Sequence, residues 1–318
     1  MSSTLRIPRS PLRQLSSARA PGTVRALASS APARAWGPSV EPVPLSYDTA
    51  VPRDPRAAGN AMVIAHGLFG SKANWRGLAT RLADALGIPV HTLDLRNHGR
   101  SPHASPHTSQ ALAADIGAFL QQQSAPRVHL VGHSMGAKAA MALALNPELN
   151  GKLATLTAVD MAPTSEPIEP QYKGYAEGMM AIAAAGVAKR AEADALLAPY
   201  EPEASTRQFL LTNAVSVKRD GKSVLDFRVN LPVLRDAIDT LGEFMFDAED
   251  PAHPTWDGPT LLLYGRNADY VREDNLPAAR AFFPNMRAVP LDAGHWVHAD
   301  QPDETVRAIA AFVGQHLK

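Results

Sequence analysis

The chain has 318 residues, of which 45% are hydrophobic and 19% are charged, and its formal net charge at pH 7 is zero. This balance is typical of a globular protein and excludes a disordered or fibrous chain. The neutral charge gives no reason to expect nucleic acid as a partner, and the lack of cysteine excludes disulfides and thiolate chemistry. No stretch approaches the roughly 20 apolar residues of a transmembrane helix, so we expect no membrane-spanning segment.

The first 40 residues differ in charge from the rest of the chain. They contain no Asp or Glu, and their arginines are spread among Ser, Ala and Leu: Arg6, Arg9, Arg13, Arg19, Arg25 and Arg34. A segment that is rich in Arg and Ser and free of acids is typical of a mitochondrial transit peptide. We therefore predict that residues 1–40 direct the protein to mitochondria, with the matrix as its destination. A disordered basic tail is the alternative, and the prolines of the segment favour it.

Short apolar runs alternate with helical patterns from about residue 60 onward. The runs predict strands at 61–65, 90–95, 128–131 and 153–159, and the helical patterns between them cover 74–86, 108–123 and 135–145. We expect Asn74 to be the N-cap of the first helix and Gly87 to end it. Strands separated by helices of this length imply βαβ units and therefore a mostly parallel sheet with helices on both faces.

The alternation stops between residues 161 and 247. A proline-rich opening leads into a helical pattern over 175–197, and a second helical pattern covers 231–246. Strands at 260–264 and 287–291 and helices at 275–283 and 302–316 then resume the βα order. We interpret residues 161–247 as a helical cap inserted into an α/β core that is formed by residues 45–160 and 248–318.

The strongest chemical signal is Gly132-His133-Ser134-Met135-Gly136, a G-x-S-x-G sequence between a predicted strand and a predicted helix. That context is typical of a nucleophile elbow, in which a tight turn raises the serine hydroxyl above the sheet. The flanking glycines are required because a Cβ there would collide with nearby backbone. The sequence therefore predicts Ser134 as a nucleophile. An ordinary glycine-rich turn of a Rossmann-like sheet is the alternative.

A serine nucleophile needs a base to take its proton. Gly294-His295-Trp296 follows the last predicted strand, where this fold delivers its histidine, so we predict that His295 is the base. His298 lies three residues further on, and we expect it to point into solvent or toward the sheet edge.

Two carboxylates compete for the role of orienting that histidine. The usual position is in the loop after the strand at 260–264, three residues after Gly265, but Ala268 occupies it and Asp269 comes one residue late. Asp160 ends the strand beside the one that carries Ser134. We favour Asp160 over Asp269, because the role requires only a buried carboxylate facing the imidazole Nδ1–H.

An acyl-transfer site also needs donors for the oxyanion of the tetrahedral intermediate. The backbone amide of Met135, directly after the nucleophile, is one predicted donor. The second is expected from the loop that begins at His66, and we choose Leu68, with Phe69 as the alternative. A phosphate-binding loop at residues 67–72 lacks the required G-x-x-x-x-G-K-[ST] spacing.

The segment from Asp94 to Ser101 reads as a structural loop in which Asp94 and Arg96 hold backbone near the elbow. His103 and His107 are four residues apart, but the prolines beside them preclude a helix that would align them on a metal. We assign no metal and no cofactor.

Six segments resemble one branch of the α/β-hydrolase superfamily: HGLFGSKANW, DLRNHGRSPH, GHSMGAKAAM, VDMAPT, FRVNLPVL and AGHWVHADQP. Together they are similar to the alpha/beta hydrolase domain-containing protein 11 group, which includes mitochondrial hydrolases, small bacterial esterases and yeast ethanol acetyltransferases. The resemblance spans residues 45–317 and implies an α/β-hydrolase fold with Ser134, His295 and Asp160 as catalytic residues. Ala137 departs from the group, whose members usually carry glycine there.

These observations favour hydrolysis of a short- or medium-chain carboxylic ester or acyl thioester through an acyl-serine intermediate. Transfer of the acyl group, for example from acetyl-CoA, to an alcohol such as ethanol uses the same residues and is the alternative. A mitochondrial interaction protein that has lost catalysis is a third reading, and an intact Ser134, His295 and Asp160 argue against it. The expected partner is a small acyl substrate, and the sequence makes no prediction of the oligomeric state.

Overall fold

The computed structural model describes residues 40–317. The predicted import segment, residues 1–40, lies outside the described residues except for Val40, so its role stays a prediction.

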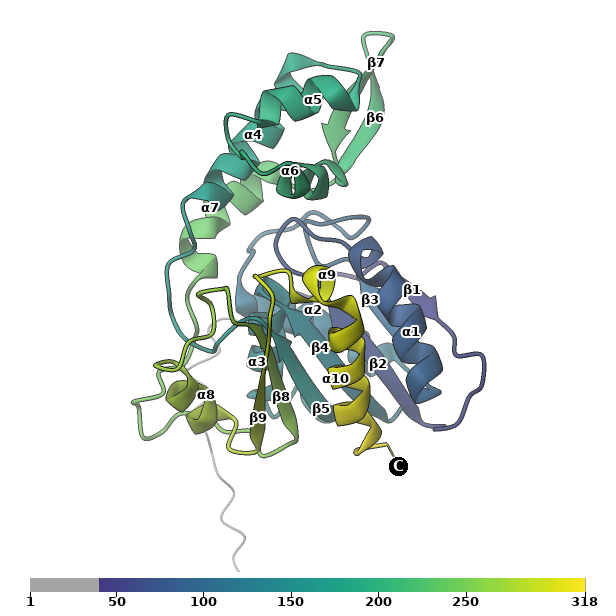
Figure 1. Ribbon diagram of the computed structural model, residues 1–318, viewed down its shortest axis with the longest axis vertical. Coiled ribbons are helices and arrows are strands. Elements are labelled where there is room, and N and C mark those ends of the chain that lie inside the picture. Colours follow the sequence, from purple (N-terminus) through teal and green to yellow (C-terminus); the bar gives the residue numbers. More distant parts are fainter. Residues whose placement is uncertain (1–39, 318) are drawn as a thin grey trace, which may run out of the picture. The chain divides into compact units, whose positions relative to one another are not determined.

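Within the described residues, one sheet contains seven strands in the order β1-β3-β2-β4-β5-β8-β9 (Figure 1). The pair β1–β3 is antiparallel and the remaining pairs of the sheet are parallel. The strands are β1 (Tyr47–Ala50), β2 (Asn60–Ala65), β3 (Val90–Leu93), β4 (Arg127–His133), β5 (Leu153–Val159), β8 (Thr260–Gly265) and β9 (Met286–Leu291). The edge strand β1 was not predicted, because its four residues are largely exposed and show no apolar run.

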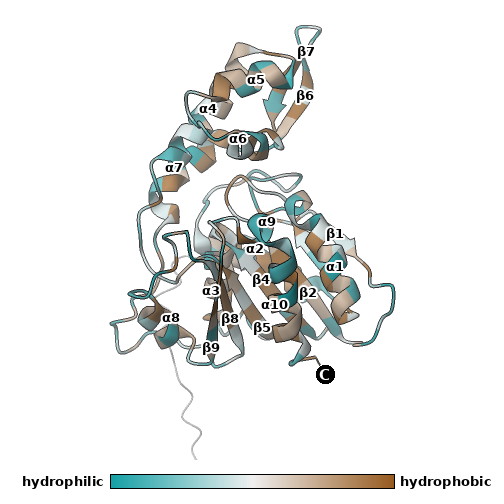
Figure 2. Cartoon of the chain, viewed as in Figure 1, coloured by the Kyte–Doolittle hydropathy of each residue, from teal (hydrophilic) through white to brown (hydrophobic). Residues whose placement is uncertain are grey.

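Helices cover both faces of the sheet (Figure 1). The central strands β2 and β4 are almost entirely buried, and hydrophobic residues predominate in β2 (Figure 2). Successive side chains of a strand point to opposite faces, so Met62 and Ile64 of β2 pack in one hydrophobic cluster while Val63 and Ala65 pack in the other. The first cluster includes α1 (Arg76–Leu86) and α10 (Pro302–Gly314), and the second includes α2 (Ser109–Gln122), α3 (Met135–Ala144) and α8 (Leu276–Phe282).

The helix ends follow local side-chain chemistry. Thr108 caps α2, since its hydroxyl accepts a hydrogen bond from the Ala111 amide at 3.2 Å. Gly87, with φ of 68°, ends α1 as predicted. The predicted N-cap at Asn74 is wrong. A 3-10 turn at Lys72–Trp75 precedes α1, and the Asn74 side chain accepts from the Ser71 amide at 2.6 Å within that turn.

Residues 161–247, which we call the cap, contain a β-hairpin as well as helices. The elements are α4 (Gln171–Ala185), α5 (Arg190–Leu197), α6 (Ala204–Leu211), β6 (Ala214–Arg219), β7 (Lys222–Phe227) and α7 (Leu231–Leu241). The single helix predicted over 175–197 is wrong, because Gly186 ends α4 with φ of 65°. The hairpin was not predicted. It turns at Asp220-Gly221, and both residues have positive φ, the signature of a tight hairpin turn.

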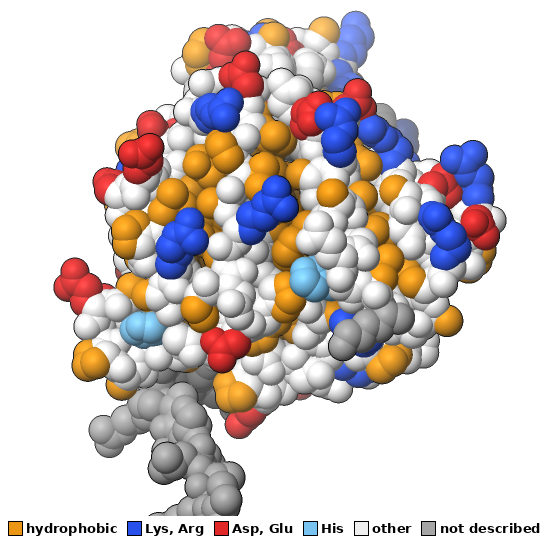
Figure 3. All heavy atoms as spheres, turned by 60° about the horizontal axis from the view of Figure 1, so that its bottom comes forward, with side chains coloured by type: hydrophobic (Ala, Val, Ile, Leu, Met, Phe, Trp, Pro, Cys, Tyr) orange, Lys and Arg blue, Asp and Glu red, His pale blue; other side chains and the backbone are white. Residues whose placement is uncertain are grey.

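No helix among residues 40–317 is both long and apolar enough to cross a membrane. On the face drawn in Figure 3, basic, acidic and hydrophobic side chains are interspersed.

Candidate active site

Ser134 lies at a sharp turn between β4 and α3, with φ of 52° and ψ of −119°. Such a backbone conformation is strained for a residue that has a Cβ. The turn closes because its flanking residues are glycines. A Cβ on Gly132 would lie 2.3 Å from the Gly136 carbonyl oxygen, and a Cβ on Gly136 would lie 2.5 Å from that of His66. The predicted G-x-S-x-G turn therefore presents the Ser134 side chain at the carboxyl end of the sheet.

His295 approaches Ser134 from the loop between β9 and α9 (Val297–Asp300). Its Nε2 lies 3.0 Å from Ser134 Oγ. Two further contacts hold the histidine: the His133 ring donates from Nε2 to the His295 carbonyl oxygen at 3.0 Å, and the Tyr270 ring lies 4.1 Å from the imidazole, centroid to centroid. The structure thus brings together two residues that are 161 positions apart in the sequence.

Asp160 lies on the other side of the His295 ring. The His295 Nδ1–H donates to Asp160 Oδ2 at 2.7 Å, and the Gly265 amide donates to Oδ1 at 2.9 Å. Asp160 is fully buried and has φ of 49°. The alternative, Asp269, is exposed, and its backbone carbonyl accepts from Arg272 at 2.6 Å. The structure therefore places Asp160, rather than Asp269, against the histidine.

Two backbone amides beside Ser134 are available as donors. The Gly67 carbonyl accepts from His66 Nδ1 at 2.8 Å and from the Gly70 amide at 3.0 Å. The Gly67 carbonyl and the Leu68 N–H belong to the same planar trans peptide and point in opposite directions. The two hydrogen bonds to the carbonyl therefore also fix the direction of the Leu68 N–H. Within residues 40–317 neither Leu68 nor Met135 has a hydrogen-bond partner for its amide. The Phe69 amide, the alternative donor, is already bonded to His98 Nε2 at 3.1 Å.

Two cavities adjoin the serine, and Ser134, Leu68 and Tyr172 line both. The smaller one, of about 460 Å³, is mainly aromatic and is also lined by Trp75, Tyr175, Phe209, His295, Trp296 and His298. The larger one, of about 840 Å³, is also lined by Met135, Lys138, Met161, Ile168, Leu241 and Arg272. Of the cap residues, Tyr172 and Tyr175 line these cavities, whereas Met179 is fully buried in the core.

Comparisons with known proteins identify the family of the chain. Residues 60–302 match the family model described as alpha/beta hydrolase fold. The chain belongs to this family. It is 37% identical to the sn-1-specific diacylglycerol lipase ABHD11 of Xenopus tropicalis over 85% of this chain and 82% of the relative. It is 36% identical to a probable alcohol acetyltransferase of Saccharomyces cerevisiae over 86% of this chain and 84% of the relative.

A solved marine microorganism esterase superposes with a TM-score of 0.74 at 29% identity and covers 85% of this chain and 99% of its own. The predicted fold class and the resemblance to the alpha/beta hydrolase domain-containing protein 11 group are confirmed. The chain is accordingly an enzyme of the hydrolase family.

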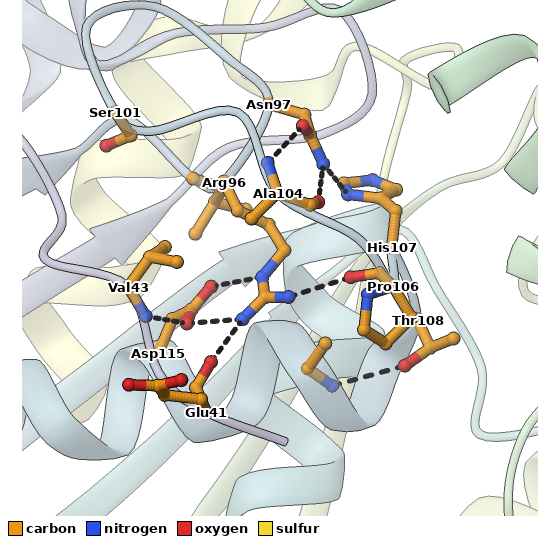
Figure 4. Close-up of polar contacts among 12 residues, drawn as sticks. Glu41, Val43, Arg96, Asn97, Ser101, Ala104, Pro106, His107, Thr108 and Asp115 are labelled. Carbon is orange, nitrogen blue, oxygen red and sulfur yellow. Dashed lines mark hydrogen bonds and ion pairs between the residues drawn. The ribbon is translucent and has the colours of Figure 1, made fainter. Parts of the chain in front are cut away.

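A group of buried histidines around the candidate active site was not predicted from the sequence. His66 accepts from the Leu95 amide at 3.0 Å, and His98 donates from Nδ1 to the Arg96 carbonyl at 2.9 Å. His107 accepts from the Asn97 side chain at 3.2 Å (Figure 4). Its Nε2 lies 3.4 Å from the sulfur of Met135. These histidines hold the two segments that carry the free amides. Only their burial and contacts reveal them, because their spacing in the sequence is irregular.

Of the two orientations considered for His298, solvent and the sheet edge, the structure excludes solvent. His298 is 7% exposed, and its ring stacks on Trp75 with the centroids 4.3 Å apart.

The loop at residues 94–101 is structural, as predicted. Asp94 accepts from the amides of Lys72 and Arg100, both at 2.9 Å. Arg96 forms a buried ion pair with Asp115, with Nε 2.6 Å from Oδ2, and donates to the Pro106 carbonyl at 2.7 Å (Figure 4). His103 donates from Nε2 to the Arg228 carbonyl, whereas the ring of His107 contacts Asn97 and Met135.

Because the histidines around the candidate active site are buried, we expect the free energy of unfolding to fall in mild acid. Burial lowers the pKa of His66 to about 4 and that of His98 to about 3, whereas an unfolded histidine has a pKa of about 6.5. Between these values the unfolded chain binds more protons than the native one, so the free energy of unfolding falls as the pH drops below about 6.5. His66 alone contributes about 3 kcal/mol to this loss by pH 4.

Urea unfolding at pH 7.5, 6 and 4.5 measures the effect. We expect a falling midpoint and a weaker pH dependence in His66→Gln. A urea midpoint that stays constant from pH 7.5 to 4.5 would contradict the claim that these histidines are neutral in the folded protein.

Proposed function

We propose that this enzyme is a serine hydrolase that cleaves short- or medium-chain carboxylic esters or acyl thioesters through an acyl-Ser134 intermediate. The observation that carries the proposal is the unbroken chain of contacts from Asp160 Oδ2 through His295 to Ser134 Oγ, at 2.7 and 3.0 Å. The lipase and esterase names of its relatives support the same reaction class.

In the first half of the reaction, the Ser134 oxygen attacks the substrate carbonyl carbon while its proton moves to His295 Nε2. The carbonyl electrons move onto oxygen, and the amides of Leu68 and Met135 stabilise that charge. One such donor contributes about 3–4 kcal/mol to the transition state. When the intermediate collapses, the bond to the leaving oxygen or sulfur breaks, and His295 returns the proton to the leaving group.

The second half repeats these steps with water. His295 takes a proton from the water, whose oxygen attacks the acyl carbon. The ester bond to Ser134 then breaks, the serine oxygen regains the proton, and the carboxylic acid leaves. Throughout, Asp160 keeps the Nδ1 proton of His295 in place and stabilises the imidazolium that forms.

The two cavities suit the two ends of such a substrate. His295 exchanges protons with the leaving group and with water, so we assign those groups to the smaller cavity, which His295 lines. The larger cavity contains Met135 and several apolar side chains but not His295. We assign it to the acyl chain.

Acyl transfer to an alcohol is the second candidate. It is favoured by the similarity to the probable alcohol acetyltransferase of Saccharomyces cerevisiae and by the space beside His295, in which an alcohol takes the place of water.

Product analysis separates the two reactions. The purified enzyme is given an acyl-CoA or p-nitrophenyl ester of two to eight carbons, with and without ethanol, and the free acid and ethyl ester are quantified. We expect free acid as the main product in both conditions and a minor ethyl ester when ethanol is present. Ethyl ester alone, with no acid in the absence of ethanol, would reverse the order of the two candidates.

A further inference from the structure

Phe69 adopts an unusual conformation next to the proposed oxyanion donor Leu68. It is fully buried and has φ of 58°. It is also the third residue of the turn that the Gly70 amide closes onto the Gly67 carbonyl. Glycine or asparagine ordinarily supplies positive φ at this position of a turn. A bulky aromatic residue stays there only where its surroundings hold it.

Two side chains hold the backbone of Phe69, one on each of its polar groups. Its amide donates to His98 Nε2 at 3.1 Å, and its carbonyl accepts from the Asn213 side-chain nitrogen at 2.7 Å. His98 belongs to the core. Asn213 belongs to the cap, where it lies between α6 and β6, and it is 3% exposed. A cap residue 144 positions away in the sequence thus completes the support of the Phe69 backbone.

We infer that Asn213 is a positioning residue: its side-chain amide holds Phe69 in the left-handed conformation and thereby aims the Leu68 N–H at the developing oxyanion. The inference rests on the proposed function, because it presupposes an oxyanion at this site. It also implies that the oxyanion-binding loop is complete only while the cap is seated on the core.

The cap has other polar ties to the core, so Asn213 is not needed merely to attach it. The Asn230 amide donates to the Asn97 carbonyl at 2.9 Å, and the two side chains are bonded at 3.0 Å. His103 bonds to the Arg228 carbonyl at 3.0 Å. Loss of the Asn213 donor therefore acts on the geometry of the turn at residues 67–70 rather than on the attachment of the cap.

The test compares Asn213→Ala and Asn213→Asp with the wild type. The aspartate keeps the shape of the side chain but has no N–H to donate to the Phe69 carbonyl. Misplacing a transition-state donor by about 1 Å costs up to about 100-fold in rate, so we expect kcat to fall by about 10- to 100-fold in both variants while KM changes by less than about twofold. The affinity for a boronic acid that forms a tetrahedral adduct on the serine should fall by the same factor as kcat.

The matched control is Asn146→Ala. Asn146 is another buried asparagine, 7% exposed, whose side chain accepts from the Glu148 amide beyond the far end of α3. All rates are normalised to the active enzyme counted by fluorophosphonate titration. Wild-type kcat and boronate affinity in both Asn213 variants would overturn the inference, and so would an equal loss in Asn146→Ala.

Ser134→Ala is measured in parallel. Retained activity in that variant would overturn the proposed function itself, so the two failures are distinguishable.

Discussion

Replacing Ser134 with alanine is expected to abolish the turnover of p-nitrophenyl acetate. In the structure Ser134 Oγ is the atom that His295 Nε2 faces at 3.0 Å, and alanine removes that atom without adding bulk. Loss of the nucleophile in a serine triad typically lowers kcat by a factor on the order of 10⁶. The measurement is the steady-state release of p-nitrophenol by the purified variant.

The substitution should leave the fold intact. Alanine carries the same Cβ as serine at the strained turn, where φ is 52°, and the side-chain hydrogen bond that it removes is the one to His295. We therefore expect an unchanged melting temperature. Ser216→Ala, at an exposed serine of the hairpin, is the control and should retain full activity. Activity above background in Ser134→Ala would mean that another residue is the nucleophile.

Replacing Asp160 with asparagine is expected to lower kcat by a factor on the order of 10⁴. The Gly265 amide donates to Oδ1 of Asp160 at 2.9 Å, while Oδ2 faces His295 Nδ1. In the variant the amide oxygen takes the position facing Gly265, so the NH₂ group faces the imidazole. An NH₂ group facing the imidazole can only donate to an unprotonated Nδ1, so the neutral His295 ring carries its proton on Nε2 instead. A protonated Nε2 cannot accept the proton of Ser134, and the histidine no longer acts as a base.

Asp269→Asn is the matched control for this prediction. Asp269 is exposed and lines the larger cavity, whereas His295 lines the smaller one. Asparagine keeps the shape of the aspartate side chain, so the variant should keep kcat within about twofold of the wild type. Both variants are measured with the same ester at pH 8. A large loss in Asp269→Asn together with a small loss in Asp160→Asn would transfer the carboxylate role to Asp269.

The proposed nucleophile and base were predictable from the sequence because each lies at a position that a local sequence pattern marks. Ser134 lies in a turn that demands glycine at two positions, and His295 follows the last strand of an alternating βα order. Asp160 was predictable less directly. Its place at the end of β5 follows from the apolar run before it, but the contact with His295 depends on the neighbouring strand order, β4-β5-β8.

The support of the oxyanion-binding loop was not predictable. His98 and Asn213 meet at Phe69 from segments 29 and 144 residues away. His98 lies in the segment DLRNHGRSPH, which gives no sign of this contact, and Asn213 belongs to none of the segments or periodic patterns described above. Positive φ at a phenylalanine likewise leaves no trace in local propensity, since tertiary contacts impose it. The hairpin of the cap was a different case: Asp220-Gly221 is a recognisable turn signal, and it lies between the helical patterns predicted over 175–197 and 231–246.

The central claim is tested most directly by trapping the acyl group. The enzyme is mixed with p-nitrophenyl acetate, quenched in acid within the first turnover and digested for mass spectrometry. We predict one acetyl group on the peptide that contains Ser134, in an amount equal to the burst of p-nitrophenol and removed by a chase at neutral pH. A burst of p-nitrophenol with that peptide unmodified, or with the acetyl group on a different residue, would contradict an acyl-Ser134 intermediate.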